Sequence, residues 1–159
     1  MPAKMEIEKK FLVVSDSWKP GDGGTPYRQG YLSTDKERTV RVRLEGQTGK
    51  FTIKGKKVGA SALEYDHEIP TDEAAEILDK FCIRPIVEKT RYKVVAKDGH
   101  VWDIDVFHGA NNGLVVAEIE LSSEGEAFER PEWLGSEVTT DSRYSNARLS
   151  EEPFSTWGK

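Results

Sequence analysis

The sequence predicts a mainly β (α+β) fold: an eight-stranded antiparallel closed β-barrel, or tunnel, with flanking helices. Eight stretches alternate apolar and polar residues with the period of two that a half-buried strand requires. Turns rich in glycine and proline separate these stretches, and few segments have helical spacing. Closure into a barrel removes the unpaired edges of an open sheet. The length predicts a single domain over 1–159, with a core over about 5–149 and a tail over 150–159.

The expected strands follow one another closely along the chain. The first strand is followed by a loop over 16–26, which contains three glycines and two prolines. Residues 46–49 and the pair Asp98 and Gly99 have the composition of tight turns. The strands are expected over 5–14, 27–32, 38–44, 51–54, 63–69, 86–95, 101–107 and 114–121.

One amphipathic helix is expected over 72–82. Two acidic residues lie in its first turn, where their charges complement the helix dipole. Its apolar residues form one stripe, which would cover outward apolar side chains of the strands such as Phe51 and Trp102. Shorter helical segments are expected over 124–128 and 141–149, and the last residues are expected to form a loose end.

Composition limits the compartment and the partners. The formal net charge of −5 argues against non-specific binding to nucleic acid or to anionic membranes. The one cysteine, Cys82, excludes an intrachain disulfide and suits a reducing compartment. No apolar run approaches the ~18 residues of a membrane span, and the start lacks the pattern of a signal peptide. We therefore expect a cytoplasmic protein with no nucleic-acid or membrane partner.

Charged residues occupy one face of nearly every strand, which permits two interpretations. In an ordinary barrel the charged faces point to solvent, and alternation alone favours this arrangement. The alternative places the charged faces in the bore. It is supported by the segregation of charge sign by strand, because a solubilising surface usually mixes signs. The basic residues are Arg41, Arg43, Lys54, Lys89 and Arg91, and the acidic residues are Glu6, Glu8, Asp103, Asp105, Glu118 and Glu120.

A bore lined by opposed basic and acidic strands would suit a polyanion bound together with a divalent metal. The guanidinium fork of arginine matches phosphate oxygens, and Mg²⁺ or Mn²⁺ bridges phosphate to carboxylate. The three histidines, His67, His100 and His108, do not have the spacing of metal ligands. If the charged faces point inward, the pattern indicates a site for a phosphorylated small molecule.

The same residues match the motifs of a known family. Residues 6–10 fit the ExExK signature of the CYTH superfamily, the triphosphate tunnel metalloenzymes. Residues 41–43 resemble its RxR strand, and residues 52–54 resemble its T-x-K strand. The remaining matches are to its EKxR strand, over 87–92, and to its acidic strands, over 103–107 and 117–120. The motifs occur in order from about 5 to 149, and the chain resembles short bacterial, tripolyphosphatase-like members.

The resemblance implies a tunnel that binds a triphosphate and hydrolyses inorganic tripolyphosphate to pyrophosphate and phosphate with Mg²⁺ or Mn²⁺. The phosphate-binding residues that it implies are Arg41, Arg43, Lys54, Lys89 and Arg91. The metal ligands that it implies are Glu6, Glu8, Asp105, Glu118 and Glu120. For Asp105 a role in orienting arginine or lysine stays open. The catalytic residues that it implies are Lys10, Tyr31, Glu6 and Glu8.

Several alternatives stay open at the level of sequence. An adenylate cyclase or a thiamine triphosphatase of the same superfamily would carry the same motifs, and so would a non-catalytic module that binds triphosphate or polyphosphate. A homodimer is possible, because outward apolar faces need covering. The sequence leaves open the roles of Asp103, Glu64, Asp66, Glu68 and Arg143.

Overall fold

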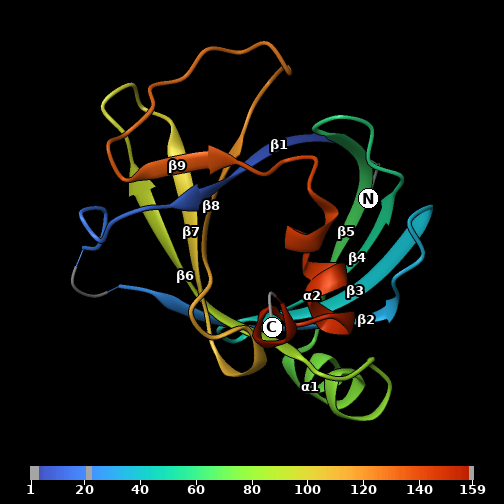
Figure 1. The fold of residues 1–159 in the computed structure, drawn as a ribbon. Coiled ribbons are helices and arrows are strands. Elements are labelled where there is room, and N and C mark those ends of the chain that lie inside the picture. The colour runs from blue at the N-terminus through green and yellow to red at the C-terminus, as the bar shows by residue number, and fades with distance from the viewer. Residues whose placement is uncertain (1–3, 21–22, 158–159) are drawn as a thin grey trace.

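A continuous antiparallel sheet curves round to form a barrel (Figure 1). The computed structural model describes residues 4–20 and 23–157. Within these ranges nine strands form one sheet in the order β5-β4-β3-β2-β6-β7-β8-β1-β9, and β5 also pairs with β1. The first eight strands therefore form the closed barrel that the sequence predicts, and this prediction is confirmed. The strands are β1 (Lys4–Val13), β2 (Thr25–Ser33), β3 (Arg38–Glu45), β4 (Thr48–Gly55), β5 (Ser61–Ile69), β6 (Val87–Val95), β7 (Val101–Phe107), β8 (Val115–Glu120) and β9 (Leu134–Glu137).

Two strands share one edge of β1. Glu8 N donates to Ala60 O at 2.9 Å, beside β5, and Val138 N donates to Lys10 O at 2.8 Å, just beyond β9. The sequence does not predict β9, because its four residues are too few to show alternation. They form a strand because β1 extends beyond its pairing with β5 and leaves backbone groups that need partners.

The helix α1 (Thr71–Lys80) covers the outer face of β3 and β4 on one side of the barrel (Figure 1). It buries Ala74 and Leu78 in a cluster with Val42, and all three are fully buried. Phe51 packs against the same cluster. The helix expected over 72–82 is confirmed, although it ends two residues earlier.

Loops cover the outer face of β1, β7 and β8. Trp102 and Phe11 are fully buried there. Phe128 and Trp133 pack edge-on against Trp102, with ring centroids 5.7 and 5.5 Å away. The expectation that α1 covers Trp102 is therefore wrong. The covering residues come from connecting segments whose apolar residues have no periodic spacing.

The helix expected over 124–128 is not present, because side-chain contacts hold this segment as a loop. Glu126 accepts a hydrogen bond from Ser122 N at 2.6 Å. Its other carboxylate oxygen lies 2.6 Å from His100 Nε2, in the turn between β6 and β7. These contacts join the loop to a neighbouring turn and leave no continuous helical ladder.

The inward face of the barrel is charged over part of its length and apolar at one end. Val87, Phe107 and Val116 have the same strand parity as the inward charged residues, and all three are buried. They form one cluster with Leu114 and Leu149. Since Leu149 belongs to α2 (Asn146–Glu151), a helix from the C-terminal segment closes this end of the bore.

The described part of the C-terminal segment is packed, and the expectation of a loose end is wrong for it. Phe154 and Trp157 contact the apolar cluster at the closed end. The helix expected over 141–149 is interrupted, since a 3₁₀ turn precedes α2. The 3₁₀ helices are η1 (Gly109–Asn111), η2 (Ser142–Tyr144) and η3 (Phe154–Thr156). Positions 21 and 22 of the expected loop and 158–159 of the expected tail lie outside the described residues.

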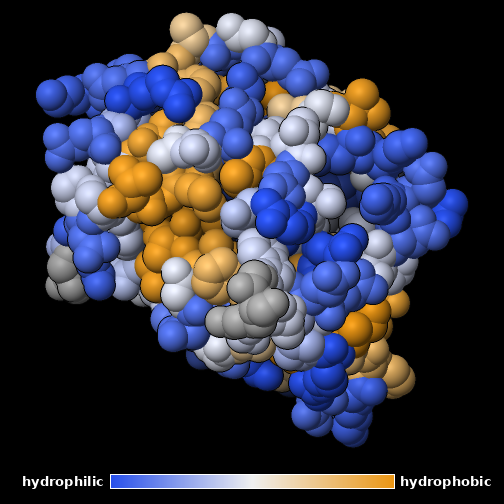
Figure 2. Space-filling view, in the orientation of Figure 1, coloured by the Kyte–Doolittle hydropathy of each residue, from blue (hydrophilic) through white to orange (hydrophobic). Residues whose placement is uncertain are grey.

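The face shown in Figure 1 is uneven in polarity. Hydrophobic residues gather on the half over β6 to β9, whereas hydrophilic residues dominate the half over β2 to β5 (Figure 2). None of the helices in the described ranges is long and apolar enough to cross a membrane.

Candidate active site

The charged rows of the strands point inward and line one cavity of about 560 Å³. This volume lies within the range of small-molecule sites, about 300–1,000 Å³. The second of the two arrangements that alternation permits is therefore the one observed. Asp105 lies behind the cavity wall, and the other predicted site residues line the cavity: Glu6, Glu8, Lys10, Tyr31, Arg41, Arg43, Lys54, Lys89, Arg91, Glu118 and Glu120.

Carboxylates from β1 and β8 form one wall. In the strand register Glu8 lies opposite Glu120, and Lys10 lies opposite Glu118. Lys10 Nζ is 3.3 Å from one Glu118 oxygen, and Arg91 Nη2 donates to the other at 2.9 Å. Burial opposes the ionisation of Glu118, but Lys10 and Arg91 outweigh it and hold the pKa of this carboxyl well below its usual range. Glu118 is therefore ionised and already neutralised by two cations.

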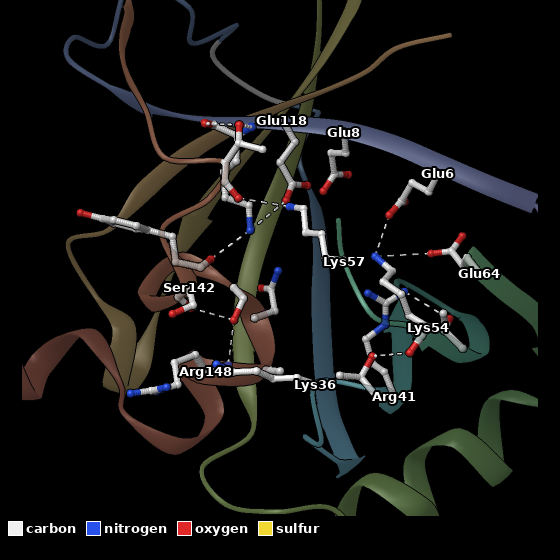
Figure 3. Close-up of a pocket in the computed structure, with 18 of the residues that line it drawn as sticks. Glu6, Glu8, Lys36, Arg41, Lys54, Lys57, Glu64, Glu118, Ser142 and Arg148 are labelled. Carbon is white, nitrogen blue, oxygen red and sulfur yellow. Dashed lines mark hydrogen bonds and ion pairs between the residues drawn. The ribbon is translucent and has the colours of Figure 1, made fainter. Parts of the chain in front are cut away.

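Glu8 has no such partner. Its side chain points into the cavity between those of Glu118 and Glu6 (Figure 3). No ion pair or side-chain hydrogen bond from the described residues reaches its carboxylate. Burial, and then the charges of Glu118 and Glu6, raise the pKa of Glu8 to about 8. A carboxylate in this position favours the binding of a cation, because a cation would offset the repulsion.

Arginines from β3 form the opposite wall. Arg41 Nη2 donates to Thr52 Oγ1 at 3.2 Å. Arg41 Nε is buried and has no partner among the described residues. Arg43 Nε donates to Glu45 at 2.8 Å. Burial, and then the charge of Arg41, lower the pKa of Arg43, so a bound anion would stabilise its charged form.

Lys54, on β4, lies among carboxylates of the neighbouring strands. Its Nζ donates to Glu6 at 2.7 Å and is 3.6 Å from Glu64, which is buried. Burial opposes the charge of Lys54, but Glu6 and Glu8 outweigh it and raise the pKa of Lys54 above its usual range. Lys54 is therefore charged and is held between Glu6 of the acidic wall and Glu64 of β5 (Figure 3).

One buried carboxylate holds Lys89 and Arg91 of β6. Asp105 is fully buried, and it accepts hydrogen bonds from Lys89 Nζ at 2.8 Å and from Arg91 Nε and Nη2 at 2.7 and 2.9 Å. Burial lowers the pKa of Lys89 to about 8, although Asp105 opposes this change. Both carboxylate oxygens of Asp105 are engaged. This geometry supports the orienting role that the sequence leaves open for Asp105.

The C-terminal segment reaches into the site, which the sequence does not predict. Lys10 Nζ donates to Tyr144 O at 2.9 Å, and Lys89 Nζ donates to Asn146 Oδ1 at 3.4 Å. The paired residues are 134 and 57 positions apart in the chain, so no local pattern indicates these contacts.

Tyr31, the remaining predicted catalytic residue, is buried and lies in register with Arg41 on the neighbouring strand.

The residues with open roles separate into two groups. Asp66 and Asp103 line the cavity together with the buried Glu64. Glu68 and Arg143 do not line it, and both are exposed. The sequence also overlooks Gln29, whose amide is fully buried and has no hydrogen-bond partner in the described part of the chain. Gln29 lies two positions from both Tyr27 and Tyr31 on β2, and this spacing places all three side chains on the same, inward face of the strand.

The acidic wall has the donor chemistry of a hard divalent cation. Mg²⁺ and Mn²⁺ prefer carboxylate oxygens, and Glu8 offers an unpaired carboxylate close to Glu6 and Glu118. Among the described residues no three Asp, Glu, His or Cys side chains are placed to enclose a metal by themselves. The residues therefore fit a metal that takes further ligands from a bound phosphate or water.

Comparison with known proteins agrees with this geometry. The family model of the CYTH domain matches residues 4–153. An inorganic triphosphatase of Acetivibrio thermocellus is 49% identical over 149 residues, which are 94% of this chain and 95% of that protein. An inorganic triphosphatase of Nitrosomonas europaea is 38% identical, over 91% of this chain and 96% of that protein.

Solved structures lead to the same family. A crystal structure of an inorganic triphosphatase superposes with a TM-score of 0.66 at 35% identity, covering 91% of this chain and 97% of that one. CYTH triphosphatases are metalloenzymes in general. The domain match, the identity of the relatives and the charged bore together show that this chain belongs to the CYTH family.

Proposed function

We propose that this protein is an inorganic triphosphatase that hydrolyses tripolyphosphate to pyrophosphate and phosphate with Mg²⁺ or Mn²⁺. The observation that carries the proposal is a cavity in which cations from β3, β4 and β6 face carboxylates from β1 and β8. A linear polyanion needs the cations, and a metal-assisted reaction needs the carboxylates. The similarity to two proteins named inorganic triphosphatase supports the choice of substrate.

In this proposal the basic wall binds the phosphates. The residues that do so are Arg41, Arg43, Lys54, Lys89 and Arg91. Two of these cations, Arg43 and Lys89, have a lowered pKa, so an arriving anion would stabilise their charged forms. Asp105 fixes Lys89 and Arg91, so that little reorganisation is needed when the substrate binds.

The acidic wall prepares the attacking water. Glu6, Glu8, Glu118 and Glu120 would hold a divalent metal, which neutralises phosphate oxygens and lowers the pKa of a bound water. Glu6 and Glu8 orient the water for in-line attack on the terminal phosphoryl group. A cation beside Glu8 would offset the repulsion that favours its protonated form, so that the ionised carboxylate could accept the proton of the water. Lys10 and Tyr31 assist beside the reacting phosphoryl group, and the arginines stabilise the pyrophosphate that leaves.

The test is phosphate release from tripolyphosphate, ATP and thiamine triphosphate, compared side by side with Mg²⁺ and with Mn²⁺. We expect the highest kcat/KM on tripolyphosphate. Equal or faster turnover of ATP or thiamine triphosphate would instead support an adenylate cyclase or a thiamine triphosphatase, and cyclic AMP formation would separate these two. Tight binding of tripolyphosphate without turnover, with either metal, would support a binding module.

A further inference from the structure

Tyr27 lies at the centre of three of the cations that we assign to phosphate binding. Arg91 Cζ is 4.9 Å from the centroid of its ring, Arg43 Cζ is 5.0 Å away, and Lys89 Nζ is 5.8 Å away. The side chain is 7% exposed and does not line the cavity. Tyr27 therefore contacts the cations from behind the cavity wall.

The strand register explains this position. β2 lies between β3 and β6, the two strands that carry these cations. Tyr27 is in register with Lys89 on β6 and with Glu45 on β3, and Glu45 accepts a hydrogen bond from Arg43. The pairing places Tyr27 between the two strands, and its ring lies where arginines from both of them converge.

The three cations repel one another, and besides burial the charges of Arg91 and Arg43 both contribute to the lowered pKa of Lys89. Burial, then Arg41, and more weakly Arg91, lower the pKa of Arg43. Arg91 is offset by Asp105 and Glu118. The face of an aromatic ring carries partial negative charge and attracts cations without the hydration of a carboxylate.

We infer that Tyr27 is a positioning residue, which holds Arg43, Arg91 and Lys89 in the arrangement that binds the triphosphate. This inference rests on the proposed function of the cavity. Tyr27 acts through the three cations and does not touch the substrate. Its ring is the required feature, because no hydrogen bond from its hydroxyl group to the described residues accompanies the three ring contacts.

The test compares Tyr27→Met with Tyr27→Phe. Methionine keeps much of the volume and removes the ring, whereas phenylalanine keeps the ring and removes the hydroxyl group. We measure the Kd of tripolyphosphate by calorimetry in EDTA, and then KM and kcat with Mg²⁺. Tyr27→Met should raise both Kd and KM about tenfold and leave kcat within about twofold. Tyr27→Phe should bind as the wild type does.

Tyr92→Met is a matched control for loss of an aromatic residue from the barrel wall. Tyr92 lies on β6 and packs outside the bore against Trp18, with ring centroids 5.2 Å apart. This variant should lower the melting temperature and leave the Kd of tripolyphosphate unchanged. An unchanged Kd in Tyr27→Met would overturn the inference, and so would a Tyr27→Phe variant as weak as Tyr27→Met.

Should Tyr27→Met fail to fold, trifluorophenylalanine at position 27 is compared with phenylalanine there. Fluorine withdraws electron density from the ring face with little change of shape, so the Kd should rise; an equal Kd would overturn the inference. Failure of the proposed function gives a different result, because the wild type would then bind tripolyphosphate without hydrolysing it. Absence of any binding by the wild type would overturn both.

Discussion

Replacing Glu8 by glutamine should stabilise the metal-free protein and at the same time remove its activity. Burial, then Glu118 and Glu6, raise the pKa of Glu8 from its ordinary 4.5 to about 8. In the unfolded chain this carboxyl ionises at its ordinary pKa. Between these two pKa values the folded protein retains a proton that the unfolded chain releases, so stability falls as the pH rises. Glutamine has no proton to lose and avoids this cost.

The structure sets the size of the effect. Without solvent screening, a change in the pKa of Glu8 from 4.5 to about 8 corresponds to about 5 kcal/mol in the free energy of unfolding. Glu8 lines the cavity and is only partly buried, so solvent screening reduces this to about 2–3 kcal/mol. Glu8→Gln should therefore equal the wild type in stability near pH 4.5 and exceed it by about 2–3 kcal/mol at pH 8. Its kcat should fall about 100-fold or more.

The assay is urea unfolding in EDTA at several pH values between these limits, with wild type and variant side by side. Glu68→Gln is the matched control, because Glu68 is exposed and does not line the cavity. Its stability should follow that of the wild type within about 0.5 kcal/mol at every pH. A Glu8→Gln variant that is less stable than the wild type at pH 8, or equally stable at every pH, would refute the reasoning.

Three further predictions concern the cation site, the closed end of the bore and the outer loops. Lys89 loses its proton as the pH passes about 8, so in a Glu8→Gln background, which removes the titration of Glu8 in the same range, the Kd of tripolyphosphate in EDTA should rise there. Adding Lys89→Met should give a high Kd without this step, and a step that persists in the double variant would contradict the assignment. Leu149→Ala should lower the free energy of unfolding in urea by about 2–5 kcal/mol, because Leu149 is fully buried in the closed end; an unchanged value would mean that the C-terminal segment is not packed. His100 lies between Glu126 and Asp98, at 2.6 and 2.8 Å, and these hydrogen bonds raise its pKa, so its stabilising effect is complete below its unfolded pKa and is lost as the pH rises through the folded one. His100→Gln should therefore melt below the wild type near pH 6 and approach it near pH 9, and a constant difference would contradict this.

The sequence predicts the charged rows but does not by itself show which way they point. Glu8 and Arg41 alternate with apolar residues in the same way whether the charged face is inside or outside. The motif order and the segregation of charge sign favour the inside, where the structure places both residues. The strand register then distinguishes Asp105 from Asp103, which alternation places on the same face of β7. Asp105 pairs across the strands with Arg91 and is buried, whereas Asp103 pairs with the exposed Lys93.

The closed end of the bore is not visible in the sequence. Phe107 and Val116 follow the same alternation as Asp105 and Glu118, so the change from a charged to an apolar lining resembles ordinary variation along a strand. The contact of Lys10 with Tyr144 O depends on tertiary packing and on a backbone carbonyl, which has no residue-type signal. Such contacts can be identified only in the folded structure.

The most direct test of the central claim is a crystal structure with tripolyphosphate and Mn²⁺. We expect the triphosphate inside the barrel, with its oxygens on Arg41, Arg43 and Arg91, and an anomalous manganese peak beside Glu8. Tripolyphosphate bound only on the outer surface, or manganese bound away from the β1 and β8 carboxylates, would show that the charged bore is not the triphosphate site.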